Sequence, residues 1–139
     1  MKAVIIDGQG GRLGQLLTEA IIKENLNLDI LVVGTNSIAT AAMLKGGAKQ
    51  GATGENPVIV ASRDADIIMG PIGIISADSL LGEITPSMAT AIGQSRAMKF
   101  LLPVSHCNNH VVGVKMLSMN EMVTETVKDL KAFIESSSS

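Results

Sequence analysis

The chain has 139 residues, a net charge of −2 and a hydrophobic content of 46%, which together indicate one domain with a sizeable core. No apolar run reaches the roughly 18 to 20 residues of a membrane-spanning helix, and the charges form no basic stripe for nucleic acid. Two Phe, with no Tyr or Trp, argue against a base-stacking platform. A single Cys excludes an internal disulfide, and without a secretory signal we expect a cytoplasmic protein.

The first quarter of the chain alternates between strand and helix patterns. Residues 3–6, AVII, form an unalternating apolar run that is typical of a parallel strand covered on both faces. The next stretch has one apolar helical stripe, made of Leu13, Leu16, Leu17, Ala20 and Ile21. DILVVG predicts a second strand over 29–34, and a helix follows in which Asn36 or Ser37 is the N-cap and Gly46 or Gly47 ends it.

Residues 48–65 fit two structures. The β-branched residues of PVIVAS favour a strand. We prefer a short helix over 56–64, with Asn56 as N-cap and Pro57 at the first helical position. A brief strand at KQGAT then preserves the alternation of strands and helices.

The second half continues the alternation. DADIIMGP predicts a strand that ends at Gly70, and ISADSLLG (75–82) and TPSMATAIGQSRA (85–97) predict helices, the second capped by Thr85 with Pro86 at its first position. MKFLLPV predicts another strand, and HVVGVKML (110–117) an edge strand or hairpin arm. Ser118 and Glu121 form a capping box for a last helix, whose apolar face either fills the core or packs in a homodimer.

This order predicts an α/β fold: a three-layer, mostly parallel Rossmann-like sheet with helices on both faces, in a single domain over residues 1–135. Residues 136–139, SSSS, are expected to form a frayed tail. In such sheets the ligand lies beyond the carboxyl ends of the strands. The candidate ligand regions are therefore residues 7–11, 34–37, 70–73 and 105–109.

The first of these regions contains a glycine-rich turn, GQGGRLG. Glycine permits positive φ and lets a phosphate reach backbone N–H groups, and the following helix directs its positive end at that phosphate. The match to the G-x-G-x-x-G dinucleotide fingerprint is imperfect: Gly8 and Gly10 fit its first two positions, but Leu13 stands where the third glycine belongs. The alternative is a tight strand-to-helix corner without a ligand.

No acidic residue ends the second predicted strand, where one would hold the ribose of NAD. Thr35, Asn36 and Ser37 stand there instead and are candidates for contacts to a phosphate or ribose. The full set of candidate cofactor-binding residues is Gly8, Gln9, Gly10, Gly11, Arg12, Gly34, Thr35, Asn36, Ser37, Gly70 and Pro71.

Both histidines and the cysteine lie within five residues, SHCNNH. His106, Cys107 and His110 are candidate zinc ligands, since zinc binds nitrogen and sulfur. His106, Cys107 and Asp7 are also candidates for nucleophilic or acid–base catalysis. A polar loop with an ordinary small cysteine explains the same residues without any chemistry.

Four stretches together resemble a small bacterial family catalogued as a domain of unknown function (number 3842): IDGQGGRLG, GTNSIATAAMLKGGAKQGATGEN, DIIMGPIGIISADSLLGEITP and CNNHVVGVK. The resemblance covers nearly the whole chain and implies a short Rossmann-like protein, with no activity or catalytic residue to carry over. More distantly, the GGRLG start is similar to the cofactor domain of prephenate-dehydrogenase-like enzymes. The chain departs from those enzymes in lacking the acidic residue and a second domain.

We therefore expect a binding module that holds a nucleotide, NAD(P) or similar, or another phosphorylated metabolite at the glycine turn. Two alternatives stay open. One is a small homo-oligomeric enzyme, oxidoreductase-like or dependent on a metal or thiol. The other is an oligomeric structural or interaction protein in which the glycines serve only chain geometry.

Overall fold

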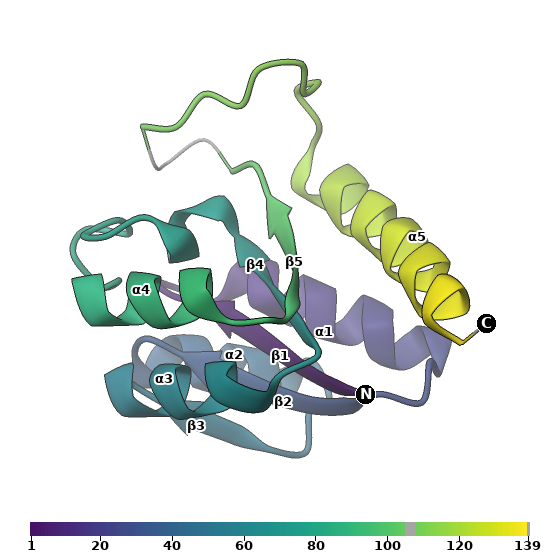
Figure 1. The fold of residues 1–139 in the computed structure, drawn as a ribbon, viewed down its shortest axis with the longest axis horizontal. Coiled ribbons are helices and arrows are strands. Elements are labelled where there is room, and N and C mark those ends of the chain that lie inside the picture. Colours follow the sequence, from purple (N-terminus) through teal and green to yellow (C-terminus); the bar gives the residue numbers. More distant parts are fainter. Residues whose placement is uncertain (105–107, 139) are drawn as a thin grey trace.

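A computed structural model describes residues 1–104 and 108–138, and within them the chain forms one parallel five-stranded sheet with helices on both faces (Figure 1). The strand order is β3-β2-β1-β4-β5, which is the order of the first five strands of the Rossmann fold. The predicted fold class is confirmed. The elements are β1 (Lys2–Asp7), α1 (Arg12–Glu24), β2 (Asp29–Gly34), α2 (Ser37–Lys45), β3 (Gly51–Thr53), α3 (Glu55–Asp64), β4 (Ile67–Pro71), the 3₁₀ helix η1 (Ile72–Ile75), α4 (Pro86–Gln94), β5 (Met98–Leu102) and α5 (Met119–Ser137).

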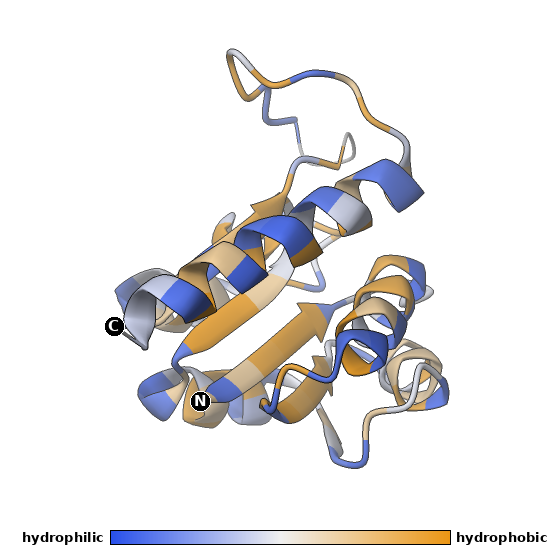
Figure 2. Ribbon diagram, turned by 90° about the vertical axis from the view of Figure 1, so that its right-hand side faces the viewer, coloured by the Kyte–Doolittle hydropathy of each residue, from blue (hydrophilic) through white to orange (hydrophobic). Residues whose placement is uncertain are grey.

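The central strand β1 is buried on both faces, as its unalternating apolar run predicted. Val4 and Ile6 point into a cluster with α3 and α4, whereas Ala3 and Ile5 point into a cluster with α1, α2 and α5. Figure 2 shows strands that are mostly hydrophobic along their length and helices that alternate between hydrophobic and polar residues. These two clusters cover the two faces of the sheet and fix the position of its carboxyl edge.

The apolar face of α5 is buried within the chain, against α1 and β5. Val127 and Leu130 belong to the core, and the rings of Phe133 and Phe100 meet edge to face with centroids 5.7 Å apart. Core filling therefore accounts for this face. The helix continues to Ser137, past residue 135, where we expected the domain to end.

Most predicted helix ends are confirmed. Asn36, Thr85 and Ser118 cap α2, α4 and α5 through their side chains, and residues 55–64 are helical as preferred. The predicted cap of α3 was wrong by two residues. The helix begins at Glu55 after Gly54, which has a φ of 109°, so Asn56 already lies inside the first turn.

Two predicted elements were wrong. Residues 75–82 form no α-helix: after η1 the chain turns, and Asp78, Leu80 and Leu81 take left-handed φ values of 55–66°. Residues 110–117 form no strand, and Val112 and Met116 are 86% and 98% exposed. Among the described residues, no strand pairs with 110–117, and strand propensity without a partner strand and a buried face does not form a strand. In 75–82, hydrogen bonds of tight turns replace those of a helix.

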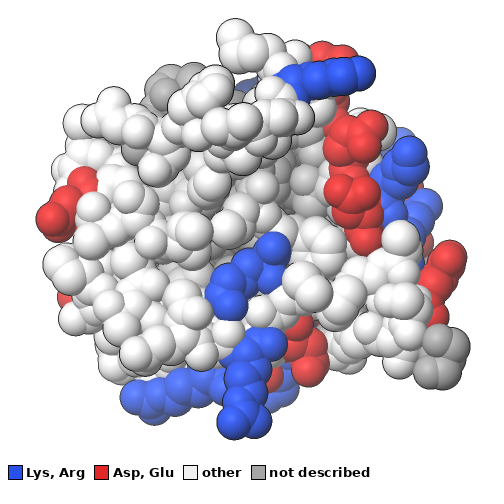
Figure 3. All heavy atoms as spheres, turned by 45° about the horizontal axis from the view of Figure 1, so that its top comes forward, with Lys and Arg blue, Asp and Glu red and all other residues white. Residues whose placement is uncertain are grey.

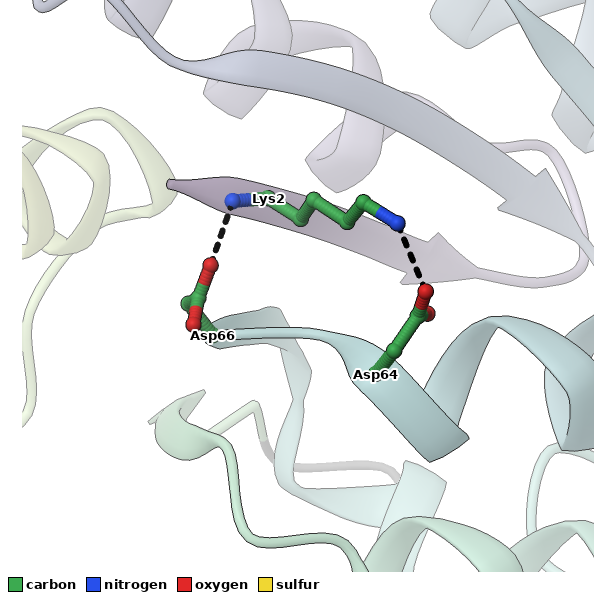
Figure 4. A network of polar contacts seen from close by, with 3 residues as sticks. All are labelled: Lys2, Asp64 and Asp66. Carbon is green, nitrogen blue, oxygen red and sulfur yellow. Dashed lines mark hydrogen bonds and ion pairs between the residues drawn. The ribbon is translucent and has the colours of Figure 1, made fainter.

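A small polar network lies at the amino edge of the sheet (Figure 4). The backbone N–H of Lys2 donates to Asp66 at 2.7 Å, and the Lys2 ammonium pairs with Asp64 at 2.6 Å. The network ties the start of β1 to the connection between α3 and β4. Because the ion pair is exposed, its contribution to stability is small.

Candidate functional site

The strand order reverses between β1 and β4, since the chain runs outward from β1 through β2 to β3 and then returns to β4 on the other side. Parallel sheets bind ligands at such a switch point, beyond the carboxyl ends of the strands. A pocket of about 150 Å³ lies there. Its walls are residues 7–13 of the glycine turn together with Pro71, Leu80, Val104 and Met119.

Larger hollows of about 440 to 530 Å³ lie elsewhere on the surface. One is at the amino edge of the sheet beside residues 25–30, and the others flank α5. One hollow beside α5 does join the carboxyl end of β5, at Leu101 and Leu102, to the first turn of α5, at Met122, but it lies beside the edge strand. The smaller pocket brings the glycine turn and the start of α1 to the switch point, so we place the candidate site there.

The Asp7 carboxylate organises the inner side of the glycine turn. The backbone N–H groups of Gly8 and Gly14 donate to its two oxygens at 2.8 and 2.7 Å, and the side chain is only 6% exposed. Burial raises the pKa of Asp7, the two amides oppose that rise, and the charge of Glu83 adds to it. With both oxygens engaged, Asp7 is placed to hold the turn against the first turn of α1.

Glu83 grips the outer side of the same turn, from the loop between η1 and α4. Its Oε1 accepts hydrogen bonds from the Gln9 amide at 2.9 Å, the Thr35 hydroxyl at 2.5 Å and the Asn36 side-chain amide at 2.8 Å. Partial burial acts to raise the pKa of Glu83, but the hydrogen bonds from Thr35, Gln9 and Asn36 outweigh it, so the pKa is lowered. The group is therefore a carboxylate at neutral pH.

Three glycines of the turn are explained by close packing. A Cβ on Gly8 would lie 2.6 Å from Thr35 Oγ1, one on Gly11 would lie 2.7 Å from the Ala39 Cα, and one on Gly14 would lie 2.5 Å from the Met43 sulfur. Gly11 also has a φ of 74°. These positions need glycine whether or not a ligand binds.

Gly10 differs from its neighbours. Among the described residues, a Cβ there would have no neighbour within 4 Å, and the φ of Gly10 is outside the left-handed region. Packing therefore gives no reason for a glycine at this position. An open approach to the backbone, as a bound group would need, does give one.

The backbone N–H groups around Gly10 are a second indication of a ligand site. Over residues 1–104 and 108–138, no acceptor bonds the N–H groups of Gly10, Arg12 or Leu13, and all three residues line the pocket. No side chain caps the N-terminus of α1 at Gly11. The start of α1 thus presents free donors and the positive end of its dipole to the pocket.

Two other predicted ligand contacts have structural explanations. A Cβ on Gly34 would collide with the Thr40 hydroxyl, and one on Gly70 with the carbonyl oxygen of Ile6. Both glycines are needed where elements approach closely. Pro71 does line the pocket, while Ser37 is exposed at the first turn of α2.

Two members of the predicted histidine–cysteine group cannot be placed relative to the third. His106 and Cys107 lie outside the described residues, and His110 is exposed in the segment after β5. Within the described part of the chain, no three His, Cys, Asp or Glu side chains are grouped to hold a metal ion. No described helix is long and apolar enough to cross a membrane.

Figure 3 shows the face seen when the upper side of Figure 1 is brought forward. Much of this face is uncharged, and acidic and basic side chains stand next to one another on the side of α5.

Sequence reasoning missed Glu83 and Leu80 entirely. Leu80 lies in the stretch 75–82 that was predicted to be a helix, and Glu83 lies between the two predicted helices, 74 residues from its partner Gln9 along the chain. The only available signal was the position of this stretch after the carboxyl end of β4, which the topology places near the glycine turn.

The chain is similar in fold to a solved structure and matches one family model in sequence. One solved structure, a dodecameric FMN-dependent Ubix-like decarboxylase from Escherichia coli O157:H7, superposes with a TM-score of 0.47 at 16% identity, over 94% of this chain and 76% of the other. No curated protein matches in sequence. A family model described as a domain of unknown function, DUF3842, matches residues 2–135, and the chain therefore belongs to that family.

Proposed function

We propose that this protein is a binding module for a phosphorylated small molecule, a nucleotide such as NAD(P) being one candidate, held at the glycine turn between β1 and α1. The observation that carries the proposal is the row of unpartnered amides of Gly10, Arg12 and Leu13 on the pocket wall. A phosphate group would accept these N–H groups and gain from the dipole of α1. The exposed Arg12 side chain adds a cation at the same end of the helix.

Gly10 supplies the sharpest mutational test. Gly10→Asp puts a carboxylate where the phosphate would lie, and since a Cβ there meets nothing, the fold should tolerate it. Gly93→Asp is the matched control: Gly93 also has open space around its Cβ, and it lies near the end of α4 away from the turn. We expect Gly10→Asp to abolish ligand binding and Gly93→Asp to leave it unchanged.

The ligand can be sought first by absorption, because a chain without Trp or Tyr is nearly transparent at 280 nm. A nucleotide carried through purification would dominate the ultraviolet spectrum, and mass spectrometry of the denatured sample would identify it. Titration calorimetry with NAD, AMP and inorganic pyrophosphate then tests ligands that are lost during purification. No bound ligand, together with no heat from any of the three, would refute the proposed function.

A further inference from the structure

Three hydrogen-bond donors from two separate segments converge on one anionic oxygen beside the pocket. The backbone N–H of Gln9 belongs to the glycine turn, and the Thr35 hydroxyl and the side-chain NH₂ of Asn36 follow β2. All three donate to Glu83 Oε1. Two more hydrogen bonds fix the Asn36 side chain. Its Oδ1 accepts from the Ala39 N–H and so caps α2, and its NH₂ group also donates to the backbone carbonyl of Gln9. The donor set is thus a preorganised anion hole, in which charge-assisted bonds stabilise a negative oxygen.

The occupant of this hole belongs to a strained loop. In residues 76–84, Leu80 and Leu81 have φ values of 55° and 57°, a left-handed conformation that residues other than Gly, Asn and Asp rarely adopt. Asp78, with a φ of 66°, tolerates the same conformation. Leu81 is 94% exposed, so no packing compensates its strain. Strain of this kind gathers at switch regions and ligand clamps.

The same loop roofs the pocket. The buried Leu80 side chain lines the pocket. It packs close to the glycine turn, since a Cβ added to Gly8 would lie 3.0 Å from Leu80 Cδ1. With this roof in place the cavity is about 150 Å³, below the roughly 300–1,000 Å³ of typical ligand pockets. Glu83 thus fills the donor set while Leu80, three residues earlier, covers the pocket.

We infer that Gln9, Thr35 and Asn36 form a phosphoryl subsite and that Glu83 occupies it as an internal gate. This rests on the proposed function and adds to it a second group of donors beside those of Gly10, Arg12 and Leu13. A phosphoryl oxygen and the Glu83 carboxylate are both anions and compete for the same three donors. The ligand therefore binds only when loop 76–84 lifts, and its apparent affinity is reduced by the fraction of molecules that are closed.

The test uses inorganic pyrophosphate, which has phosphoryl groups and no organic part, in calorimetric titrations of the full chain at pH 7. Glu83→Ala empties the subsite, and Glu83→Gln keeps a neutral acceptor on the donors, so it preserves the contacts if the alanine variant does not fold. If fewer than about a tenth of wild-type molecules are open, Glu83→Ala should bind pyrophosphate at least about tenfold more tightly. Glu83→Gln should show a smaller gain, because its neutral oxygen still occupies the donors but holds them more weakly than a carboxylate does. Asp78→Asn removes the same charge from the same loop at an exposed residue and should leave the affinity at the wild-type value.

Adding Thr35→Val to the Glu83→Gln variant should cancel most of the gain, since the subsite loses a donor. In the wild type, pyrophosphate should raise amide hydrogen exchange in residues 76–84 as the loop lifts. Equal affinities for wild type and both Glu83 variants, all lost on Gly10→Asp, would overturn the gate and leave the proposed function standing. No binding by wild type or by either Glu83 variant would overturn both.

Discussion

Asp7 and Glu83 both accept backbone N–H groups of the β1–α1 turn, but they are held in different ways. Asp7 is buried at the end of β1 and bonds amides one and seven residues away, so its contacts are built into the local chain. Glu83 is partly exposed and reaches the turn from a loop with three left-handed residues. Under the gate proposed above, the buried Asp7 carboxylate shapes the turn, and the partly exposed Glu83 carboxylate occupies its donors reversibly.

Removing the Asp7 carboxylate should give the largest change in the free energy of unfolding. Asp7→Ala leaves the buried amides of Gly8 and Gly14 without an acceptor, and each unsatisfied group costs about 1–3 kcal/mol. We expect the free energy of unfolding in urea to fall by about 3–4 kcal/mol. Asp64→Ala, which removes an exposed partner of Lys2, should cost less than about 1 kcal/mol. Equal losses in the two variants would show that the Asp7 bonds do not hold the turn.

The glycines sharpen the comparison within the turn. Gly11→Ala places a Cβ 2.7 Å from the Ala39 Cα in a residue with left-handed φ, and we expect it to lower the free energy of unfolding by about 2 kcal/mol. Gly10→Ala meets neither obstacle and should change it by less than about 1 kcal/mol. Thermal unfolding of the two variants measures the difference. A large loss for Gly10→Ala would mean that packing, after all, requires this glycine.

The two carboxylates should respond to pH with opposite signs. The folded-state pKa of Asp7 lies above its ordinary 3.8, so the ionised group opposes folding, and stability is gained as pH falls from the raised pKa toward 3.8. The folded-state pKa of Glu83 lies below its ordinary 4.5, so its contribution is complete above pH 4.5 and is lost as pH falls through the lowered value.

Urea unfolding of wild type, Asp7→Asn and Glu83→Gln across this acidic range separates the two contributions. As pH falls, the stability of wild type should rise relative to Asp7→Asn and fall relative to Glu83→Gln. Parallel curves for all three proteins would mean that neither carboxylate changes its pKa on folding.

The smallest expected effect on the free energy of unfolding is the relief of backbone strain in loop 76–84. Leu81→Asn replaces an exposed left-handed leucine with a residue that tolerates this conformation, and we expect stability to increase by up to about 1 kcal/mol. Ile38→Asn removes another exposed apolar side chain, 69% exposed in α2, from a residue without left-handed φ, and should give no such gain. A destabilised Leu81→Asn variant would show that Leu81 has a role its exposure does not reveal.

The sequence by itself determined the layered α/β architecture, because buried parallel strands and one-sided helices leave periodic patterns of apolar residues that are local in the chain. It also determined most helix starts, since the caps at Asn36, Thr85 and Ser118 act within three residues. The glycine turn was visible for the same reason.

Only the tertiary structure decided how the residues of the candidate site are packed and hydrogen-bonded. Gly34 and Gly70 proved to be packing positions, and Gly10 proved to be open, because a glycine's neighbours come from other elements. Glu83 bonds Gln9 across 74 residues of sequence, and it directly follows the stretch 75–82, which was predicted to be a helix and instead contains left-handed turns. Sequence periodicity reports which face of an element is buried, whereas hydrogen-bond partners and steric fit depend on contacts between elements that are distant along the chain.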